Sequence, residues 1–415
     1  MRRLTIALVV LVVAGPVARG QAVGAPHRET VEFRVLERTR TFMSAAVGDG
    51  GETPAAVHAL RLLLARPDAA AALTDVLERA RHPAGRLFAL AGLRAVDPTA
   101  FARAVDGLRG SDEPISFLDG CIESRTTVGA AVEALAAGNL ADVLCGRVEV
   151  RLRPRLELEE ACARLAEGGE SRLVIDALVA HGPAAVPALR EALRAGPAPA
   201  QAGAAAACER LGPVARDALP ELLALVEAAD DDVGLGALDA VSALSCWAVE
   251  QGVPALRRTL ERAALPPARL VRTVSLLEHL VRGLGLLEPA PPPPWVRRTE
   301  HEDGEATYAL VHLPATTIAA LARALGDDDA EVGEDAANIL GRAAGPAAFE
   351  PARAVLDDPR PLAREGALTV LAELALSHAG LRPAATAALT WHGARDPDER
   401  VRAHARDLLE LFEDD

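Results

Sequence analysis

Apolar residues recur along this chain at helical spacing, and in several segments the same order of residue types returns. The last such segment begins at Asp396-Pro397 and carries Val401, Ala405 and Leu409, which lie four residues apart and therefore share one helical face. The small middle residue lets a neighbouring helix approach closely. Three earlier segments show the same order: Leu362, Gly366 and Val370; Val332, Ala336 and Leu340; Val233, Ala237 and Val241.

The residues between these segments predict where each helix ends. Gly182-Pro183, Gly212-Pro213 and Gly345-Pro346 place glycine where one helix stops and proline where the next begins. Aspartate before the second helix of each pair is expected to cap it and to suit its dipole. Proline also recurs in the first helices, where we expect it to bend them, in Val186-Pro187-Ala188-Leu189, Leu219-Pro220-Glu221-Leu222 and Val253-Pro254-Ala255-Leu256.

The repeated segments and turns resemble the HEAT-repeat family, in particular its bacterial lyase-like subgroup. The resemblance is good over 170–284 and 314–415, fair over 54–110 and poor over 111–169. It implies an all-α fold, an α-α superhelix of the HEAT-type solenoid kind. A non-repetitive helical bundle is the alternative.

Two segments interrupt the repeat pattern. Residues 147–153 alternate charged and apolar side chains, as a short strand does. Residues 285–313 are rich in proline, and the Asp303-Gly304 turn signal between two extended segments predicts an inserted β-hairpin. The expected organisation is a signal peptide (1–20), irregular helical repeats (26–169), HEAT-like repeats (170–284), the inserted loop or hairpin (285–313) and C-terminal HEAT-like repeats (314–415).

The inserted segment carries two of the chain's few aromatic residues, Trp295 and Tyr308. One interpretation makes them part of an edge that contacts a partner, and both are therefore candidate binding residues. The other interpretation is a loop that packs back on the solenoid.

The N-terminus has the three regions of a secretory signal peptide: a basic start, the apolar run Leu4–Ala14 and small residues at Ala18 and Gly20. The apolar run is shorter than the roughly 20 residues that a membrane span needs. An uncleaved anchor is the alternative. We expect an exported protein, periplasmic or extracellular, with no membrane span in the mature chain.

Charge and composition narrow the range of partners. The chain has a net charge of −15, and all 44 of its basic residues are arginine. An acidic surface repels phosphate backbones, so we expect no nucleic-acid partner.

Aromatic residues make up only 3% of the chain, which predicts a core of leucine, alanine and valine. The oligomeric state stays open.

The spacing of the five cysteines predicts one disulfide. Cys121 and Cys145 are 24 residues apart and flank the region of weakest repeat character, and an oxidising compartment permits their pairing. Cys162 and Cys208 lie on apolar helical faces, where buried thiols are expected. For Cys246 the sequence allows either a disulfide or a buried free thiol.

The sequence shows no recognisable catalytic motif, metal site or cofactor site. His301-Glu302 is a single His-Glu pair on a loop, whereas the iron-binding HEAT enzymes that hydroxylate a modified lysine carry several. Glu278-His279 is predicted to lie on an apolar helical face. The runs 230–232 and 327–329 consist of aspartate and are interpreted as helix caps rather than calcium ligands.

These observations favour a non-catalytic scaffold that binds a protein or peptide along the groove of a solenoid. The resemblance implies that second helices line the concave side, which makes Arg364, Arg402 and Arg406 candidate groove residues. The alternative is a lyase-like or metal-dependent enzyme, or a chaperone, that acts on a bound small molecule or a modified protein.

Overall fold

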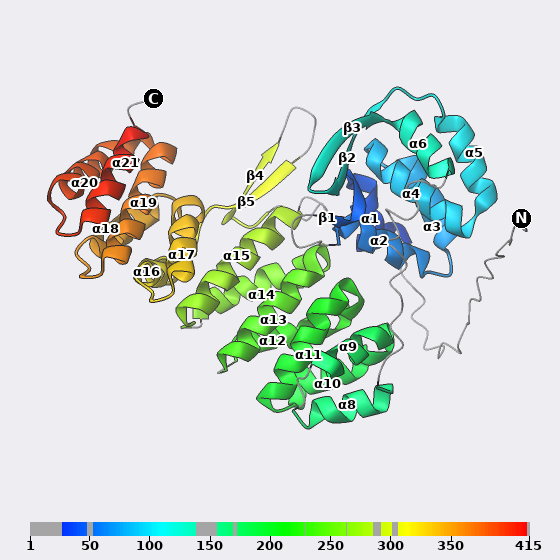
Figure 1. The fold of residues 1–415 in the computed structure, drawn as a ribbon, viewed down its shortest axis with the longest axis horizontal. Helices are drawn as coiled ribbons and strands as arrows, with labels where there is room; N and C mark the ends of the chain where they lie inside the picture. The colour runs from blue at the N-terminus through cyan, green and yellow to red at the C-terminus, as the bar shows by residue number, and fades with distance from the viewer. Residues whose placement is uncertain are drawn as a thin grey trace, which may run out of the picture.

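The chain folds as an all-α superhelix of stacked helix pairs with a small sheet and a hairpin added to it (Figure 1). The computed structural model describes residues 27–47, 53–137, 156–168, 172–228, 230–262, 264–284, 292–300 and 306–412. The predicted strand at 147–153 lies outside these residues.

Residues 156–412 form a repeat array, in which seven helix pairs follow one another in the described part of the chain. The first helices make one layer: α8 Leu158–Ala166, α10 Val186–Ala195, α12 Leu219–Leu225, α14 Val249–Arg262, α16 Ala315–Ala324, α18 Phe349–Val355 and α20 Arg382–Arg395. The second helices pack side by side in the other layer: α9 Arg172–His181, α11 Ala198–Leu211, α13 Asp231–Leu244, α15 Pro267–Gly283, α17 Ala330–Ala343, α19 Pro361–Ser377 and α21 Glu399–Glu410.

The predicted glycine turns are confirmed. Gly182, Gly212 and Gly345 adopt positive φ angles of 58°, 53° and 60°, and each follows the end of a second helix. The prediction that proline bends the first helices is wrong for two of them. Pro187 and Pro220 lie in the first turns of α10 and α12, where a missing N–H costs nothing, and only Pro254 lies inside a helix.

The predicted aspartate caps are confirmed for α13, α17 and α21. They are absent from α11, α15 and α19, whose N-cap residues Pro197, Pro266 and Arg360 make no side-chain cap. The carboxylate of Asp329 accepts from the backbone N–H of Glu331, and that of Asp398 accepts from the N–H of Arg400. Asp230 accepts from the N–H of Val233 at 3.1 Å, so the runs of aspartate serve as caps, as interpreted from the sequence.

The predicted register of one repeat is wrong by one residue. Leu362 is 41% exposed, whereas Ala363 and Ala367 are fully buried against the neighbouring helices. The equivalents of Val401 and Ala405 in α19 are therefore Ala363 and Ala367 rather than Leu362 and Gly366. The order of a large, a small and an aliphatic residue fits Leu362, Gly366 and Val370 but not Ala363, Ala367 and Leu371, so it indicated the wrong register.

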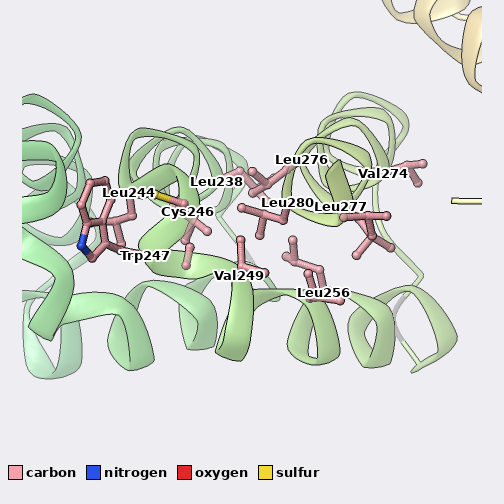
Figure 2. Close-up of a cluster of buried hydrophobic side chains, with 14 of the residues drawn as sticks. Leu238, Leu244, Cys246, Trp247, Val249, Leu256, Val274, Leu276, Leu277 and Leu280 are labelled. Carbon is pink, nitrogen blue, oxygen red and sulfur yellow. The ribbon is translucent and has the colours of Figure 1, made fainter. Parts of the chain in front are cut away.

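The core of the array consists of small and aliphatic side chains, as the composition predicts. Figure 2 shows one section, where leucines and valines of α13, α14 and α15 interlock beside Trp247. Cys246 and Cys208 are buried, in agreement with the prediction for Cys208, and Cys162 is half-buried. Burial raises the pKa of the Cys208 thiol to about 12, which keeps it protonated and unreactive.

Residues 27–137 form an N-terminal module that departs from regular repeats. Its helical part comprises η1 His27–Glu29, α1 Val31–Arg38, α2 Ala55–Leu64, α3 Ala69–Arg79, α4 Pro83–Val96, α5 Pro98–Leu108 and α6 Val128–Ala137. A three-stranded sheet that the sequence did not predict lies among them, with β1 Phe42–Val47 parallel to β2 Pro114–Gly120 and β3 Ile122–Thr127 antiparallel to β2.

The N-terminal module contacts the middle of the repeat array. Arg216 in the turn after α11 donates to the buried carboxylate of Glu32 on α1 at 2.8 Å. The ring of His58 on α2 lies edge-on to that of Trp247, with 6.4 Å between the centroids. The module therefore rests on the turns that precede α12 and α14.

The predicted inserted hairpin is confirmed. β4 Val296–Glu300 pairs antiparallel with β5 Ala306–Leu310, and β5 packs on α15. Val296, Tyr308 and Leu310 are buried at this contact.

By length and composition alone, one stretch among the described residues is long and apolar enough to cross a membrane. Residues Arg172–Ala195 span 24 residues with a mean hydropathy of 1.3. They comprise α9, the turn at Gly182–Ala185 and α10, which belong to different layers of the array. Leu178 and Leu189 are fully buried in the core there, although only 33% of the apolar window is buried.

Candidate functional site

The two aromatic candidates on the inserted hairpin face the solenoid rather than solvent. Tyr308 is 7% exposed. Trp295 is half-buried, and the Arg257 guanidinium carbon lies 5.1 Å from its ring centroid. Arg257 also donates to the carbonyl of His312 at 2.8 Å, which ties the hairpin to α14. The geometry agrees with a loop packed back on the solenoid.

The arginine candidates of the C-terminal repeats hold turns together. Arg364 donates to the carbonyls of Asp358 and Pro359, and Arg402 donates to those of Asp396 and Pro397. In both turns the two accepting carbonyls belong to the residues six and five positions before the arginine. Arg406 is exposed and donates to the carbonyl of Arg402. The structure thus gives Arg364 and Arg402 a role in fixing Asp-Pro turns.

The Arg364 side chain is also buried, so it cannot line an open groove. It is 6% exposed, and its guanidinium donates to both oxygens of Asp396 at 2.9 and 2.8 Å. Burial alone would raise the pKa of Asp396, but hydrogen bonds from Arg364, the Asp398 backbone and His392 lower it to about 2. The groove prediction for Arg364 is therefore corrected: its side chain is a buried link between two repeats.

The predicted Cys121–Cys145 disulfide stays a prediction, because Cys145 lies outside the described residues. Cys121 is exposed at the turn between β2 and β3, so a strand hairpin rather than a helical one carries it. His301-Glu302 also lies outside the described residues. Glu278 is buried and His279 is exposed, which reverses the expected placement of that histidine.

Charged side chains recur on the solvent-facing side of the second-helix layer, which we call the second-helix face (α9, α11, α13, α15, α17, α19 and α21). Three ion pairs join neighbouring helices there, and their partners stand 34, 33 and 35 residues apart, about one repeat. They are Asp176–Arg210, Asp239–Arg272 and Glu365–Arg400.

Three glutamates on this face have carboxyl groups whose pKa values lie above the ordinary value. Burial raises the pKa values of Glu209, Glu278 and Glu373, and nearby arginines lower them by less. Arg342 on α17 approaches Glu278 on α15 at 3.9 Å and is also the arginine that acts on Glu373 on α19. A Cβ at Gly341 would overlap the Glu373 carboxylate, so this glycine makes room for it.

The face can therefore present ordered, partly desolvated carboxylates and guanidinium groups at intervals of one helix. Carboxyl groups with shifted pKa values occur at functional sites more often than elsewhere. Sequence reasoning missed Glu209, Glu278 and Glu373, although a signal was present. Each lies in a second helix, and the apolar faces of these helices leave the glutamate at the edge of the core. Within the described residues, no group of three or more histidine, cysteine, aspartate or glutamate side chains could hold a metal ion.

No protein-family model matches the chain, and no curated protein matches its sequence. Among solved structures, a designed armadillo repeat protein is 19% identical with a TM-score of 0.30 and covers 61% of this chain and 99% of its own. Human deoxyhypusine hydroxylase in complex with glycerol is 19% identical with a TM-score of 0.25, over 80% of this chain and 96% of its own.

Kap121p bound to Pho4p is 13% identical with a TM-score of 0.30 and covers 91% of this chain and 41% of its own. Identities and TM-scores this low carry no inference about activity or partner.

Proposed function

We propose that this chain is an exported, non-catalytic scaffold that binds an extended protein segment along its second-helix face. The observation that carries the proposal is the recurrence of charged side chains on this face at intervals of one repeat. A regular series of polar groups suits a ligand that is itself periodic, as an extended backbone is. The signal-peptide pattern at 1–20 supports a site of action in the periplasm or outside the cell.

The dimensions of the face suit such a ligand. Neighbouring helices pack about 8–10 Å apart, so seven side by side give a face roughly 50–60 Å long. An extended chain advances about 3.3 Å per residue, so the face spans roughly 16 residues. A small-molecule enzyme would instead concentrate its polar groups in one pocket.

The test measures binding of a captured partner to two charge-reversal variants. The mature chain captures partners from an envelope extract, and each identified partner is then titrated. Arg272→Glu with Arg342→Glu reverses two charges on the second-helix face. Arg258→Glu with Arg353→Glu reverses two exposed charges on the first helices α14 and α18. We expect the first variant to weaken binding at least about tenfold, equivalent to about 1.4 kcal/mol, and the second to bind as the unaltered chain does.

Equal affinities for all three proteins would overturn the proposal, since the face would then make no contact. A third variant, in which residues 292–310 are replaced by a short linker, separates the hairpin from the face. Loss of binding only in this variant would assign recognition to the hairpin instead.

A further inference from the structure

The guanidinium group of Arg402, near the start of α21, is held in place by its own Asp-Pro turn. Its Nη1 donates to the carbonyls of Asp396 and Pro397 at 2.8 and 3.2 Å. Arg364, one repeat earlier, is held in the same way, since its Nη1 donates to the two equivalent carbonyls at 2.8 and 3.1 Å. The two arginines therefore present their remaining nitrogens, Nε and Nη2, in equivalent positions relative to their turns.

The earlier repeat shows which group such a guanidinium binds. The Nε and Nη2 of Arg364 donate to the two carboxylate oxygens of Asp396 at 2.9 and 2.8 Å. Asp396 belongs to the next helix pair, where it lies in the turn between α20 and α21. The Nε and Nη2 of Arg402 have no hydrogen-bond acceptor among the described residues, and this side chain is half-buried. Arg402 is thus oriented as Arg364 is, without a carboxylate from the described part of the chain.

A second arginine lies one turn further along α21, on the same side of the helix. The Nε of Arg406 donates to the carbonyl of Arg402 at 3.1 Å, and the side chain is exposed. Its stem packs close to Gly393 on α20, because a Cβ at this glycine would meet the Arg406 Cγ at 3.3 Å. No carboxylate of a described residue lies within ion-pair distance of either arginine.

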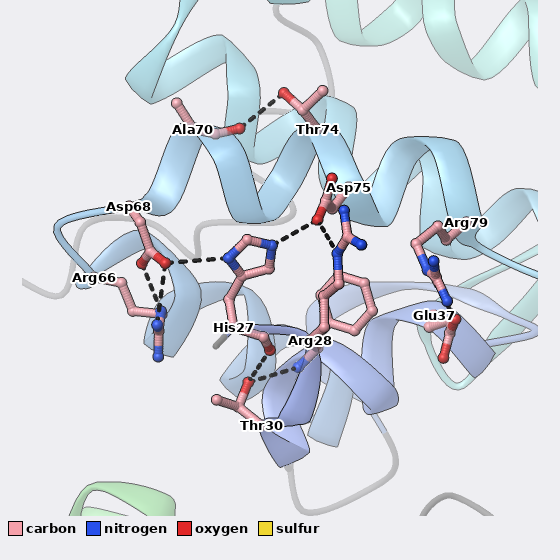
Figure 3. Close-up of polar contacts among 11 residues, drawn as sticks. His27, Arg28, Thr30, Glu37, Arg66, Asp68, Ala70, Thr74, Asp75 and Arg79 are labelled. Carbon is pink, nitrogen blue, oxygen red and sulfur yellow. Dashed lines mark hydrogen bonds and ion pairs between the residues drawn. The ribbon is translucent and has the colours of Figure 1, made fainter. Parts of the chain in front are cut away.

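The anchoring of Arg402 distinguishes it from the other arginines of the chain. Many of those are paired: in the N-terminal module, Arg66 donates to Asp68 at 2.8 Å and Arg28 pairs with Asp75 (Figure 3). A lack of acids does not explain the difference, since the chain has 59 acidic residues and 44 basic ones.

The outer side of α21 is not built to receive a further apolar repeat. Arg406 and Glu410 occupy the positions that Leu368 and Ala372 have in α19, counted from the equivalent arginines. Leu368 and Ala372 are buried, whereas Arg406 and Glu410 are exposed. Stacked repeats bury an apolar face between them, so this polar surface suits contact with a charged group better than contact with another helix pair.

We propose that Arg402 and Arg406 bind an aspartate side chain of an acidic partner segment, in the way that Arg364 binds Asp396. A planar guanidinium donates two parallel hydrogen bonds to the two oxygens of one carboxylate, and Arg406 adds a second positive charge one turn away. A second copy of this chain fits less well, because two molecules with a net charge of −15 each repel one another. The inference does not rest on the proposed function, since it concerns the outer side of the last described helix pair.

The test measures the fluorescence anisotropy of a short labelled peptide that carries two Asp-Pro dipeptides, at fixed ionic strength and neutral pH. The same peptide with asparagine in place of aspartate is the ligand control. We expect saturable binding of the aspartate peptide alone, weakened about tenfold or more in Arg402→Lys, which keeps the charge but loses the planar donor pair. The matched control, Arg258→Lys, alters an exposed arginine of α14 and should bind as the unaltered chain does.

Equal affinities for the two peptides, or an equal loss in Arg402→Lys and the control, would overturn the proposal. Self-association that Arg402→Lys abolishes, without binding of the peptide, would assign the site to a second copy instead. Residues 413–415 are acidic and follow α21 in the sequence. A chain that ends at Phe412 should bind the peptide at least as tightly as the full chain, and a loss of binding would assign recognition to those residues.

A second measurement on the unaltered chain covers the case in which Arg402→Lys does not fold. The aspartate peptide should protect Arg402 and Arg406 from modification by phenylglyoxal more than it protects Arg258. Equal modification of the three arginines with and without the peptide would also contradict the proposal.

Discussion

The carboxylate of Asp396 is fully enclosed, and three donors hold it as an anion. Arg364 contributes two of the hydrogen bonds, and the His392 ring lies 2.8 Å away. Removing a buried ion pair from water is costly, and the cost is offset only by close pairing and added hydrogen bonds, so a buried charge that loses its partner is strongly unfavourable. The arginine that sequence reasoning assigned to a binding groove therefore stabilises the junction of the last two repeats.

We predict that Arg364→Met lowers the free energy of unfolding by about 3–5 kcal/mol, because it leaves Asp396 buried without its main partner. The matched control is Arg400→Met, since Arg400 is 74% exposed and pairs with Glu365 at 3.4 Å. An exposed pair contributes about 0–1 kcal/mol, so the control should change stability little. Urea unfolding followed by circular dichroism measures both variants. Equal losses in the two would contradict the role assigned to Arg364.

At the scale of single elements, the turn glycines make a prediction that depends on backbone conformation alone. Gly345 has a φ of 60°, and a Cβ placed there would meet only the Val311 carbonyl, at 3.7 Å. The cost of a side chain is therefore conformational rather than steric. Gly107 is the second-last residue of helix α5 (Pro98–Leu108), and a Cβ there would meet nothing within 4 Å.

We predict opposite signs for the same substitution at these two glycines. Gly345→Ala should destabilise the chain by about 1–2 kcal/mol, because a left-handed conformation is unfavourable for alanine. Gly107→Ala should stabilise it by about 0.5–1 kcal/mol, because alanine is the better helix former. Thermal unfolding of both variants decides the matter. A shift in the same direction for the two would mean that φ at Gly345 does not govern its turn.

The repeat array could be predicted from the sequence because each of its signals is local. The glycine turns, the aspartate caps and the hairpin at 296–310 each depend on residues a few positions apart. The three-stranded sheet could not be predicted in full, because β1 and β2 pair in parallel across a long stretch of chain, as between Phe42 and Phe117. The β2–β3 hairpin did have a local signal, because Gly120 lies between two short segments and, with Cys121, forms the two-residue turn between the paired residues Asp119 and Ile122.

The candidate site was less predictable than the fold. Arginine in an Asp-Pro turn motif looks the same in sequence whether its guanidinium faces solvent or the turn carbonyls, and Arg364 and Arg402 do the latter. The sequence places Glu278 and Glu373 at the edge of apolar helical faces, but only the packing of α15, α17 and α19 brings both carboxyl groups near Arg342.

At the scale of the whole molecule, the N-terminal module and the repeat array are joined by contacts between distant parts of the chain. Glu32 and Arg216 stand 184 residues apart, and their ion pair joins α1 to the turn after α11. His58 lies at the same junction, between Gly212 and Trp247. Burial first, and the charge of Arg61 second, lower the pKa of His58 to about 4. The junction is therefore built for a neutral imidazole.

We predict that acidification weakens this junction between about pH 6.5 and pH 4. An unfolded histidine titrates near pH 6.5, so within this window the unfolded chain binds more protons than the folded one, and stability falls as pH falls. The stability is fully present above about pH 6.5 and lost below about pH 4. Urea midpoints measured across the window should fall more steeply for the unaltered chain than for His58→Gln. His312→Gln alters an exposed histidine and should keep the full slope. Parallel slopes for all three proteins would show that His58 stays accessible to protons in the folded chain.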